Sequence, residues 1–359
     1  MIKHTINLKD RSYPIYITTS FEGLGKAMQS LRTGKKAVLI TDRNVDAHYS
    51  EECMKELQDS GFEVYKHVLE PGEHNKTLEA VYEIYKKLVE YKLDRTSTLF
   101  ALGGGVVGDI CGFAAATYMR GINFIQIPTT LLAQADSSVG GKTGVDFDGH
   151  KNAVGAFYQP KLVFINVNTI KTLPKREISA GLAEVAKHGL IMDEEFCEYL
   201  NYNAKKIFSF DENALQFLAK KNCSIKGQVV EQDEKEDDLR AILNFGHTIG
   251  HAVETVQNFK LLHGECVSIG IAGAFRLAFY MDILSETVVE EAKAILLKLE
   301  LPVSLPGMDV EAVYEHMFYD KKVKDSKLKF VLPRKIGEVF QCAVDDEGLI
   351  KKVLNDLAK

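Results

Sequence analysis

Strand-like and helix-like patterns alternate through the first half of this 359-residue chain. Apolar residues at helical spacing predict a helix over residues 78–93. Short apolar runs predict strands at residues 37–40, 62–69, 98–102, 124–127 and 162–165. Alternation of this kind favours a mostly parallel sheet covered by helices, so the first half is expected to form an α/β domain.

The pattern changes after Thr172-Leu173-Pro174, where long helical patterns follow and strands become rare. In residues 290–299 the apolar side chains fall on one face, and Pro302 follows the expected end of that helix. We therefore expect two domains: an α/β domain over residues 1–176 and a mostly α-helical domain over residues 177–359.

Composition limits the class of partner. The chain has 44 Lys and Arg against 50 Asp and Glu, a formal charge of −6, which excludes a generally basic nucleic-acid binder. The first residues contain no apolar signal region, and no apolar run is long enough to span a bilayer. The six cysteines are scattered without a CxxC, which is typical of free thiols in a reducing cytoplasm. We expect a cytoplasmic protein without nucleic-acid or membrane partners.

Gly103, Gly105 and Gly108 match GxGxxG between a predicted strand and a predicted helix. Such a loop lets the backbone approach a pyrophosphate at a helix N-terminus, so the first domain is expected to be Rossmann-like and to bind a dinucleotide. The alternative is a structural turn. The usual acidic residue about 20 positions downstream is absent, but Asp42 ends an earlier strand and is suited to the ribose hydroxyls.

The run Gly140-Gly141-Lys142-Thr143 imitates the end of a Walker A loop. Asp136 stands where the earlier glycine is required, so an NTPase loop is excluded. Lys142 remains suited to binding a phosphate as a compact cation.

Three histidines, His247, His251 and His263, lie close together in the second half. The first two share a helical face in HTIGH, which is not the HExxH of zinc proteases because Thr248 replaces the glutamate. A catalytic zinc ion needs three protein ligands and an open position, and Glu184 could add a carboxylate from another helix. The alternative is that these are ordinary helix residues.

Residues 231–238, EQDEKEDD, form an acidic run that is typical of a solvated loop or helix face. Lys226, Arg240 and Asn244 flank it, and such cationic and amide groups beside the histidines suit an anionic substrate.

Taken together, the motifs LGGGVVGD, YMRG, QIPTTLLAQADSSVGGKTGVD, KNAVGAFYQP, GLAEVAKHGLI, LNFGHTIGHAVE and LLHGECVSIG resemble the 3-dehydroquinate synthases. The similarity runs in order from about Asp42 to the DKK at 320–322, and a more distant likeness links the chain to metal-dependent glycerol dehydrogenases. Asn166-Val167-Asn168 departs from the family's more usual Asp-containing version, outside the chemical motifs.

The resemblance implies a homodimeric enzyme with tightly held NAD⁺ and a catalytic divalent metal, usually Zn²⁺, with Co²⁺ as an alternative. The substrate would be a phosphorylated sugar acid, 3-deoxy-D-arabino-heptulosonate 7-phosphate, and the products 3-dehydroquinate and phosphate. One site would perform oxidation, phosphate elimination, reduction, ring opening and aldol closure, the second step of the shikimate route to chorismate and the aromatic amino acids.

The resemblance also assigns residues by matching motif. The metal ligands would be Glu184, His247 and His263. Catalytic contacts to the substrate would come from Lys142, Lys187, Lys226, Glu236, Arg240, Asn244 and His251, the last facing the leaving phosphate without binding the metal. Further substrate contacts would come from Asp136, Asn152, one of Lys321 and Lys322, and Arg120, which would reach the phosphate site of the neighbouring subunit. NAD⁺ contacts would come from Asp42, Asn44, Glu73, Lys76, Gly104, Gly105, Val106, Asp109, Thr129, Thr130, Leu132, Asp136, Ser137, Lys142, Lys151, Thr172, Leu173 and Glu177.

Three other functions compete with this one. A metal- and NAD-dependent polyol dehydrogenase would consume NAD⁺ and would not need Lys142, Lys226 and Arg240 together. Another sugar-phosphate cyclase, whose substrate lacks a carboxylate, gives no reason for a carboxylate-binding Arg240. A non-catalytic sugar-phosphate-binding protein does not need the metal candidates beside a dinucleotide loop.

Overall fold

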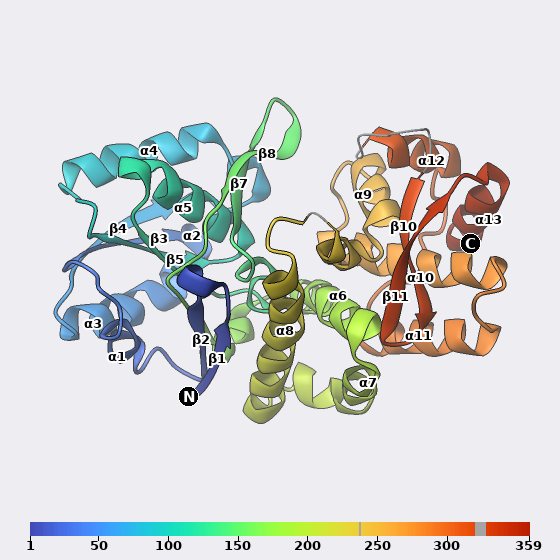
Figure 1. The fold of residues 1–359 in the computed structure, drawn as a ribbon, viewed down its shortest axis with the longest axis horizontal. Coiled ribbons are helices and arrows are strands. Elements are labelled where there is room, and N and C mark those ends of the chain that lie inside the picture. Colours follow the sequence, from blue (N-terminus) through green and yellow to red (C-terminus); the bar gives the residue numbers. More distant parts are fainter. Residues whose placement is uncertain (237, 320–327) are drawn as a thin grey trace. The chain divides into compact units, whose positions relative to one another are not determined.

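The computed structural model describes residues 1–236, 238–319 and 328–359, which form two compact units. The first unit comprises residues 1–173 and 212–231, and the second comprises residues 174–211 and 232–359. The expected architecture is confirmed: the first unit contains a mostly parallel sheet between helices, and the second is largely helical (Figure 1).

The first unit is built on a seven-stranded sheet with the order β1-β2-β9-β6-β5-β3-β4. All neighbouring strands are parallel except β1 and β2, which form an antiparallel pair at one edge. The strands are β1 (Ile2–Ile6), β2 (Tyr13–Thr18), β3 (Lys36–Asp42), β4 (Glu63–Leu69), β5 (Thr98–Gly103), β6 (Asn123–Pro128) and β9 (Leu162–Asn166). A separate hairpin consists of β7 (Lys142–Phe147) and β8 (His150–Phe157).

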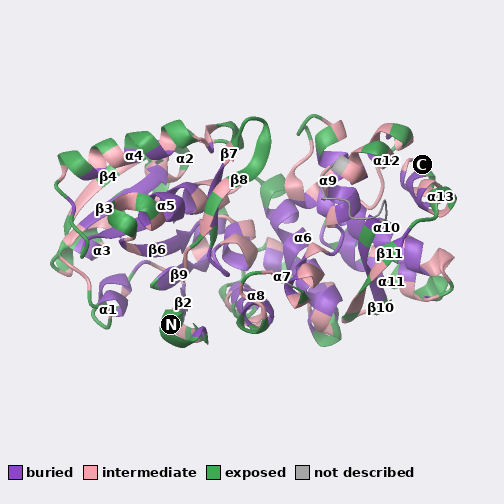
Figure 2. Ribbon diagram, turned by 45° about the horizontal axis from the view of Figure 1, so that its top comes forward, coloured by how far each residue is buried: buried purple, intermediate pink, exposed green. Residues whose placement is uncertain are grey.

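Alternation along β3 explains why helices cover both faces of this sheet. Val38 and Ile40 pack with residues of α4 (Leu78–Glu90) and α5 (Gly105–Thr117). Ala37 and Leu39 point to the other face, where they pack with α1 (Leu24–Met28) and α3 (Glu51–Asp59). Figure 2 shows the resulting core as buried strands between helices whose outer faces are exposed. The short helix α2 (Arg43–Val45) follows β3.

Helix α8 (Glu212–Gln232) belongs to the first unit over residues 212–231, although it lies within the half of the sequence expected to form the second domain. Gly227 lies against Ile6, and the side chain of Lys226 bonds the Asp136 carbonyl oxygen. The domain boundary expected between residues 176 and 177 would place all of α8 in the second domain, so it does not describe the return of the chain to the first unit. Helical periodicity predicts that a segment is a helix, but it does not show which sheet the helix covers.

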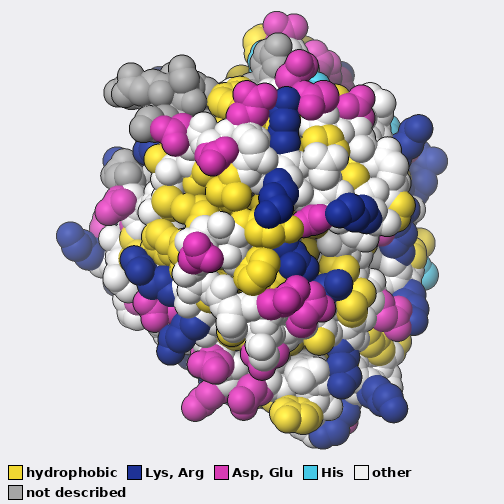
Figure 3. All heavy atoms as spheres, turned by 90° about the vertical axis from the view of Figure 1, so that its right-hand side faces the viewer, with side chains coloured by type: hydrophobic (Ala, Val, Ile, Leu, Met, Phe, Trp, Pro, Cys, Tyr) yellow, Lys and Arg dark blue, Asp and Glu magenta, His cyan; other side chains and the backbone are white. Residues whose placement is uncertain are grey.

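The second unit surrounds helix α10 (His263–Tyr280), which packs against α6, α9, α11, α13 and β10. The helices are α6 (Lys175–Met192), α7 (Glu194–Phe208), α9 (His247–Val256), α11 (Glu286–Lys298), α12 (Val310–Tyr319) and α13 (Glu347–Leu357). One hairpin joins β10 (Leu328–Lys335) to β11 (Glu338–Val344). On the face drawn in Figure 3, acidic and basic side chains are interspersed around a band of hydrophobic ones.

Two expectations concern the described residues as a whole. All six cysteines are free, and five of them are buried, as their scattered positions predicted. Among the described helices, none combines the length and apolar character needed to cross a membrane.

Candidate active site

The glycine loop lies where the sequence predicted it, between β5 and α5. Gly103 ends the strand, Gly104 caps the helix and Gly105 is its first residue. A Cβ at Gly108 would lie only 2.8 Å from Gln126 Oε1 of β6, so glycine lets α5 pack closely on the sheet. The first turn of α5 therefore presents backbone N–H groups and the positive end of a helix dipole at the carboxyl ends of parallel strands.

A buried ion pair lies next to this loop. Lys76 Nζ is 2.6 Å from Asp109 Oδ2 of α5 and also bonds Asn152 Oδ1 of β8. Burial lowers the pKa of Lys76, but Asp109 and Glu73 outweigh that effect and raise it, so the ammonium group stays charged. The resemblance assigned Lys76 and Asp109 to the cofactor and Asn152 to the substrate, and the structure places these three side chains in one cluster.

Most other cofactor candidates lie at the carboxyl ends of strands. Asp42 ends β3, and its Oδ1 accepts the backbone N–H groups of Asn44 and Val45 at 2.9 and 3.1 Å. Thr129 and Thr130 follow β6, and Thr130 Oγ1 accepts the N–H of Ala133. Leu132, Asp136 and Ser137 belong to the helical turn after β6, and Thr172 and Leu173 follow β9. Glu73 lies in a short helical turn between β4 and α4, Gly104, Gly105 and Val106 lie at the start of α5, and Lys151 lies in β8.

Lys226 of α8 forms an ion pair and a hydrogen bond with Asp136. Its Nζ is 2.6 Å from the Asp136 carbonyl oxygen and 2.8 Å from Oδ1 of the same residue. Lys142 and Lys151 are exposed on the β7–β8 hairpin. Arg120 is exposed on a short turn after α5 and has a left-handed φ of 68°.

In the second unit, one carboxylate lies next to two histidines. Glu184 of α6 is 1% exposed, and its Oε1 is 3.7 Å from His247 Nε2 and 3.5 Å from His263 Nε2. Glu184 Oε2 forms an ion pair with Lys187, one helical turn along α6. One carboxylate oxygen therefore faces Lys187, and the other faces both imidazoles.

The protonation of the two histidines differs. Burial and the charge of Lys187 hold the pKa of His247 well below its usual range, so its imidazole is neutral at neutral pH. Burial would also lower the pKa of His263, but hydrogen bonds to Glu184 and Glu254 outweigh it and raise that pKa to about 9. The carboxylates around His263 thus favour positive charge at this position.

These residues fit a divalent metal. Two imidazole nitrogens and one carboxylate oxygen converge, a donor set that suits Zn²⁺ or Co²⁺ and leaves a fourth position for substrate. His251 belongs to the same cluster, with its ring centroid 5.0 Å from that of His247 and 5.8 Å from that of His263. The helical face predicted for His247 and His251 is confirmed by α9.

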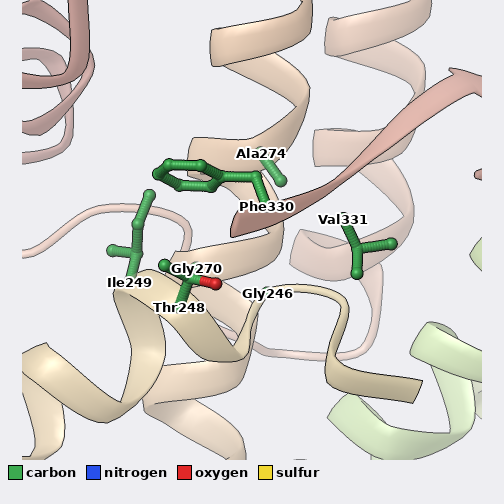
Figure 4. A pocket seen from close by; sticks show the side chains of 7 residues that line it. All are labelled: Gly246, Thr248, Ile249, Gly270, Ala274, Phe330 and Val331. Carbon is green, nitrogen blue, oxygen red and sulfur yellow. The ribbon is translucent and has the colours of Figure 1, made fainter. Parts of the chain in front are cut away.

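Close helix packing brings this cluster together. A Cβ at Gly264, beside His263, would lie 1.9 Å from the Ala180 carbonyl oxygen, one turn before Glu184 in α6. A Cβ at Gly270 would lie 1.9 Å from the carbonyl oxygen of Gly246, the residue before α9. Figure 4 shows the close approach of Gly246 and Gly270. These two glycines line a small pocket together with Thr248, Ile249, Ala274, Phe330 and Val331. Glycine is needed at positions 264 and 270 because backbone atoms of the neighbouring segment occupy the space that a side chain would take.

The acidic run is folded around Arg240 instead of being only a solvated segment. Asp233 Oδ2 accepts the backbone N–H groups of Asp238 and Arg240, each at 2.9 Å. The guanidinium of the buried Arg240 donates to the Glu234 carbonyl oxygen, and Asn244 Nδ2 donates to Glu236 Oε1 at 3.0 Å. Glu236, Arg240 and Asn244 are thereby held in one short segment.

Lys321 and Lys322 lie outside the described residues. Glu177 lies in the first turn of α6 in the second unit, where burial raises the pKa of its carboxyl group. Sequence reasoning missed Glu254 and Asp233. A signal existed for Glu254, because it lies seven residues after His247 on the same helical face.

Residues 66–180 match the family described as 3-dehydroquinate synthase N-terminal, and residues 181–323 match 3-dehydroquinate synthase C-terminal. A 3-dehydroquinate synthase from Ruminiclostridium cellulolyticum is 78% identical over 358 residues, covering 100% of both chains.

Solved structures of related cyclases have the same fold. A 2-deoxy-scyllo-inosose synthase complexed with carbaglucose-6-phosphate, NAD⁺ and Co²⁺ has a TM-score of 0.91 at 25% identity, covering 99% of both chains. A 2-epi-5-epi-valiolone synthase from Streptomyces hygroscopicus with NAD⁺ and Zn²⁺ has a TM-score of 0.89 at 27% identity, covering 98% of both chains. Since the two halves of one family match in succession and a full-length relative is 78% identical, the chain belongs to the 3-dehydroquinate synthase family.

Proposed function

We propose that this chain converts 3-deoxy-D-arabino-heptulosonate 7-phosphate to 3-dehydroquinate and phosphate, with NAD⁺ and a divalent metal as cofactors. The observation that carries this proposal within the structure is the convergence of His247 Nε2 and His263 Nε2 on Glu184 Oε1. The family match and the 78% identical relative favour dehydroquinate as the product over an inosose or a valiolone, because the two solved synthases named above are only 25% and 27% identical.

The cofactors supply chemistry that no side chain has. NAD⁺ would supply a reversible hydride acceptor. Glu184, His247 and His263 would hold the divalent metal, which would supply a Lewis acid that lowers the pKa of a substrate hydroxyl group. The turn between β5 and α5, with Gly104 and Gly105, would hold the pyrophosphate, and Asp42 would hold the ribose hydroxyls.

The remaining side chains would bind and orient the substrate. Arg240 and Lys226 suit its carboxylate, because charge-assisted hydrogen bonds are stronger than neutral ones. Lys142, Asn152, His251 and Arg120 would hold the phosphate. Once a secondary alcohol of the substrate is oxidised to a ketone, the C–H on the carbon next to that ketone becomes acidic. Loss of that proton, with the substrate's own phosphate as acceptor, would let the C–O bond to phosphate break.

Arg240 also bears on the choice among the competing functions. The chain buries this guanidinium and fixes its backbone with Asp233, which supports its role as a cation that binds a carboxylate. We also propose that the enzyme works in the cytoplasm, which the free state of its cysteines supports.

The reaction is tested by supplying NAD⁺ below the enzyme concentration. Because the hydride would be returned within each turnover, we expect many equivalents of phosphate and 3-dehydroquinate per NAD⁺, without a net rise in NADH absorbance. Phosphate release measures the elimination, and chromatography identifies the product. One NADH formed per product would support a polyol dehydrogenase instead, and a carboxylate-free cyclic product would support another cyclase.

We further propose that the enzyme is a homodimer in which Arg120 reaches the phosphate site of the neighbouring subunit. This residue is exposed on a turn that Gly121, with φ of 118°, brings back toward β6. Arg120→Ala is expected to lower kcat/KM about tenfold or more, the effect of losing a charge-assisted contact of about 1.5–3 kcal/mol. Arg95→Ala, another exposed arginine in the same unit, should leave the rate unchanged.

Mixing two variants of low activity shows which subunit's site the arginine serves. In a heterodimer of Arg120→Ala and Lys142→Ala, one site receives both defects and the other receives neither. After subunit exchange, activity should recover to about a quarter of the wild-type value, since half of a random mixture is heterodimer with one intact site. If exchange is demonstrated by mass and activity does not recover, Arg120 acts within its own subunit or only on the surface.

A further inference from the structure

The two nitrogens of the His263 ring face different carboxylates. Nε2 lies 3.5 Å from Glu184 Oε1, whereas Nδ1 lies 3.4 Å from Glu254 Oε2. The two nitrogens of an imidazole point away from each other, so Glu254 lies on the side of the ring opposite Glu184. It therefore does not belong to the group of donors around Glu184 Oε1.

The second histidine is arranged in the same way. His247 Nδ1 lies 3.0 Å from the Phe245 carbonyl oxygen, and its Nε2 faces the same oxygen of Glu184. Each ring thus has an acceptor at Nδ1, so in the neutral form that can bind a metal the proton lies on Nδ1 and the lone pair on Nε2. The difference is that the acceptor is a neutral carbonyl group for His247 and a carboxylate for His263.

Glu254 is fixed by its own helix. It lies in α9, two turns after His247, and is 7% exposed. Its backbone carbonyl oxygen accepts the N–H of Phe259 at 3.0 Å, which closes the turn that leads toward His263. Helix α9 therefore supplies His247 and also the carboxylate that contacts His263, and a short connection joins α9 to His263.

We propose that Glu254 is a positioning residue that orients His263 and strengthens it as a metal ligand, an inference that rests on the metal site in the proposed function. The carboxylate accepts the Nδ1 proton, holds the ring plane toward Glu184 and increases the electron density at Nε2. Removing such a partner typically weakens metal affinity by about 10–100-fold.

The test measures Zn²⁺ affinity of the full-length protein by competition with a chromogenic chelator. Glu254→Leu has nearly the same size and removes the acceptor, so we expect the dissociation constant to rise about 10–100-fold. Glu254→Gln keeps an acceptor but loses the charge, so we expect a smaller rise of about three- to tenfold. Circular dichroism and thermal unfolding of each variant would verify that the fold is retained.

Glu265→Gln is the matched control. Glu265 is two residues from His263, but its carboxylate contacts Arg176 at 2.6 Å and the N–H of Leu262 at 2.7 Å. If the loss of nearby negative charge alone weakened binding, this variant would show the same effect as Glu254→Gln. We expect its affinity to stay within about twofold of the wild type, because a glutamine retains the helix cap.

Two outcomes would overturn the proposal. Unchanged affinity in both Glu254 variants would mean that this carboxylate only links α9 to α10. A wild-type stoichiometry of two ions per chain that falls to one in Glu254→Leu would make Glu254 a ligand of a second ion. Failure of the metal site itself is distinguishable, because His263→Ala would then leave metal binding unchanged as well.

Discussion

Replacing His263 with alanine is expected to remove most bound metal and to lower kcat/KM by at least about 100-fold, since a catalytic metal contributes several kcal/mol to transition-state stabilisation. His263 is one of two histidines whose Nε2 atoms face Glu184 Oε1. Without it, only two of the proposed protein ligands remain, which is too few for a stable catalytic zinc site. Metal content by atomic emission and the rate of phosphate release check the two effects separately.

His48→Ala is the control for this substitution. His48 is an exposed histidine in the first unit and belongs to no assigned set, so metal content and rate should not change. Full metal content together with a near-normal rate in His263→Ala would refute the ligand assignment. Loss of activity with full metal content would instead place His263 among the substrate contacts.

Replacing Gly264 with alanine is expected to destabilise the protein and to weaken metal binding, although alanine is the better helix former. The new Cβ would lie 1.9 Å from the Ala180 carbonyl oxygen, which is backbone and therefore cannot rotate away. To make room for this Cβ, helix α10 has to move away from α6. This movement increases the distance between His263 and Glu184. Overpacking of this kind costs about 1–3 kcal/mol, and we expect the upper part of this range. Denaturant unfolding and Zn²⁺ competition measure the two consequences.

Gly348→Ala provides the comparison. Gly348 lies in α13, where a Cβ would meet only Asp346 Oδ1 at an ordinary 3.4 Å. There the higher helix propensity of alanine should stabilise the protein by up to about 1 kcal/mol without changing metal affinity. If Gly264→Ala behaved like Gly348→Ala, the close contact between α6 and α10 would not be what sets the distance between the ligands.

Sequence reasoning predicted elements that have a strong pattern. The strand expected at 37–40 is β3 (Lys36–Asp42), and the helix expected at 78–93 is α4 (Leu78–Glu90). The strands β1 and β2 at the edge of the sheet and the hairpins β7–β8 and β10–β11 were not predicted. Their alternation is short or interrupted, so their stability depends on pairing with segments that sequence reasoning could not identify.

The candidate site shows the same limit. Spacing predicted that His247 and His251 share a helical face, but it could not show which of them faces Glu184, because α6 is distant in the sequence. The acidic run appeared to be a solvated segment because composition does not reveal that Asp233 caps the turn holding Arg240. Helical periodicity likewise gave no indication that α8 packs on the first unit.

The backbone contacts at Gly264 and Gly270 also affect which ions the protein accepts. These contacts hold the spacing of α6, α9 and α10 through main-chain atoms, so the spacing does not depend on the identity of the ion. We therefore expect divalent ions of similar radius to exchange without refolding and to be ranked by their affinity for imidazole and carboxylate donors. Related cyclases have been solved with Co²⁺ in one case and Zn²⁺ in another. For this chain, the metal found after purification should accordingly reflect both this ranking and the supply of ions in the growth medium.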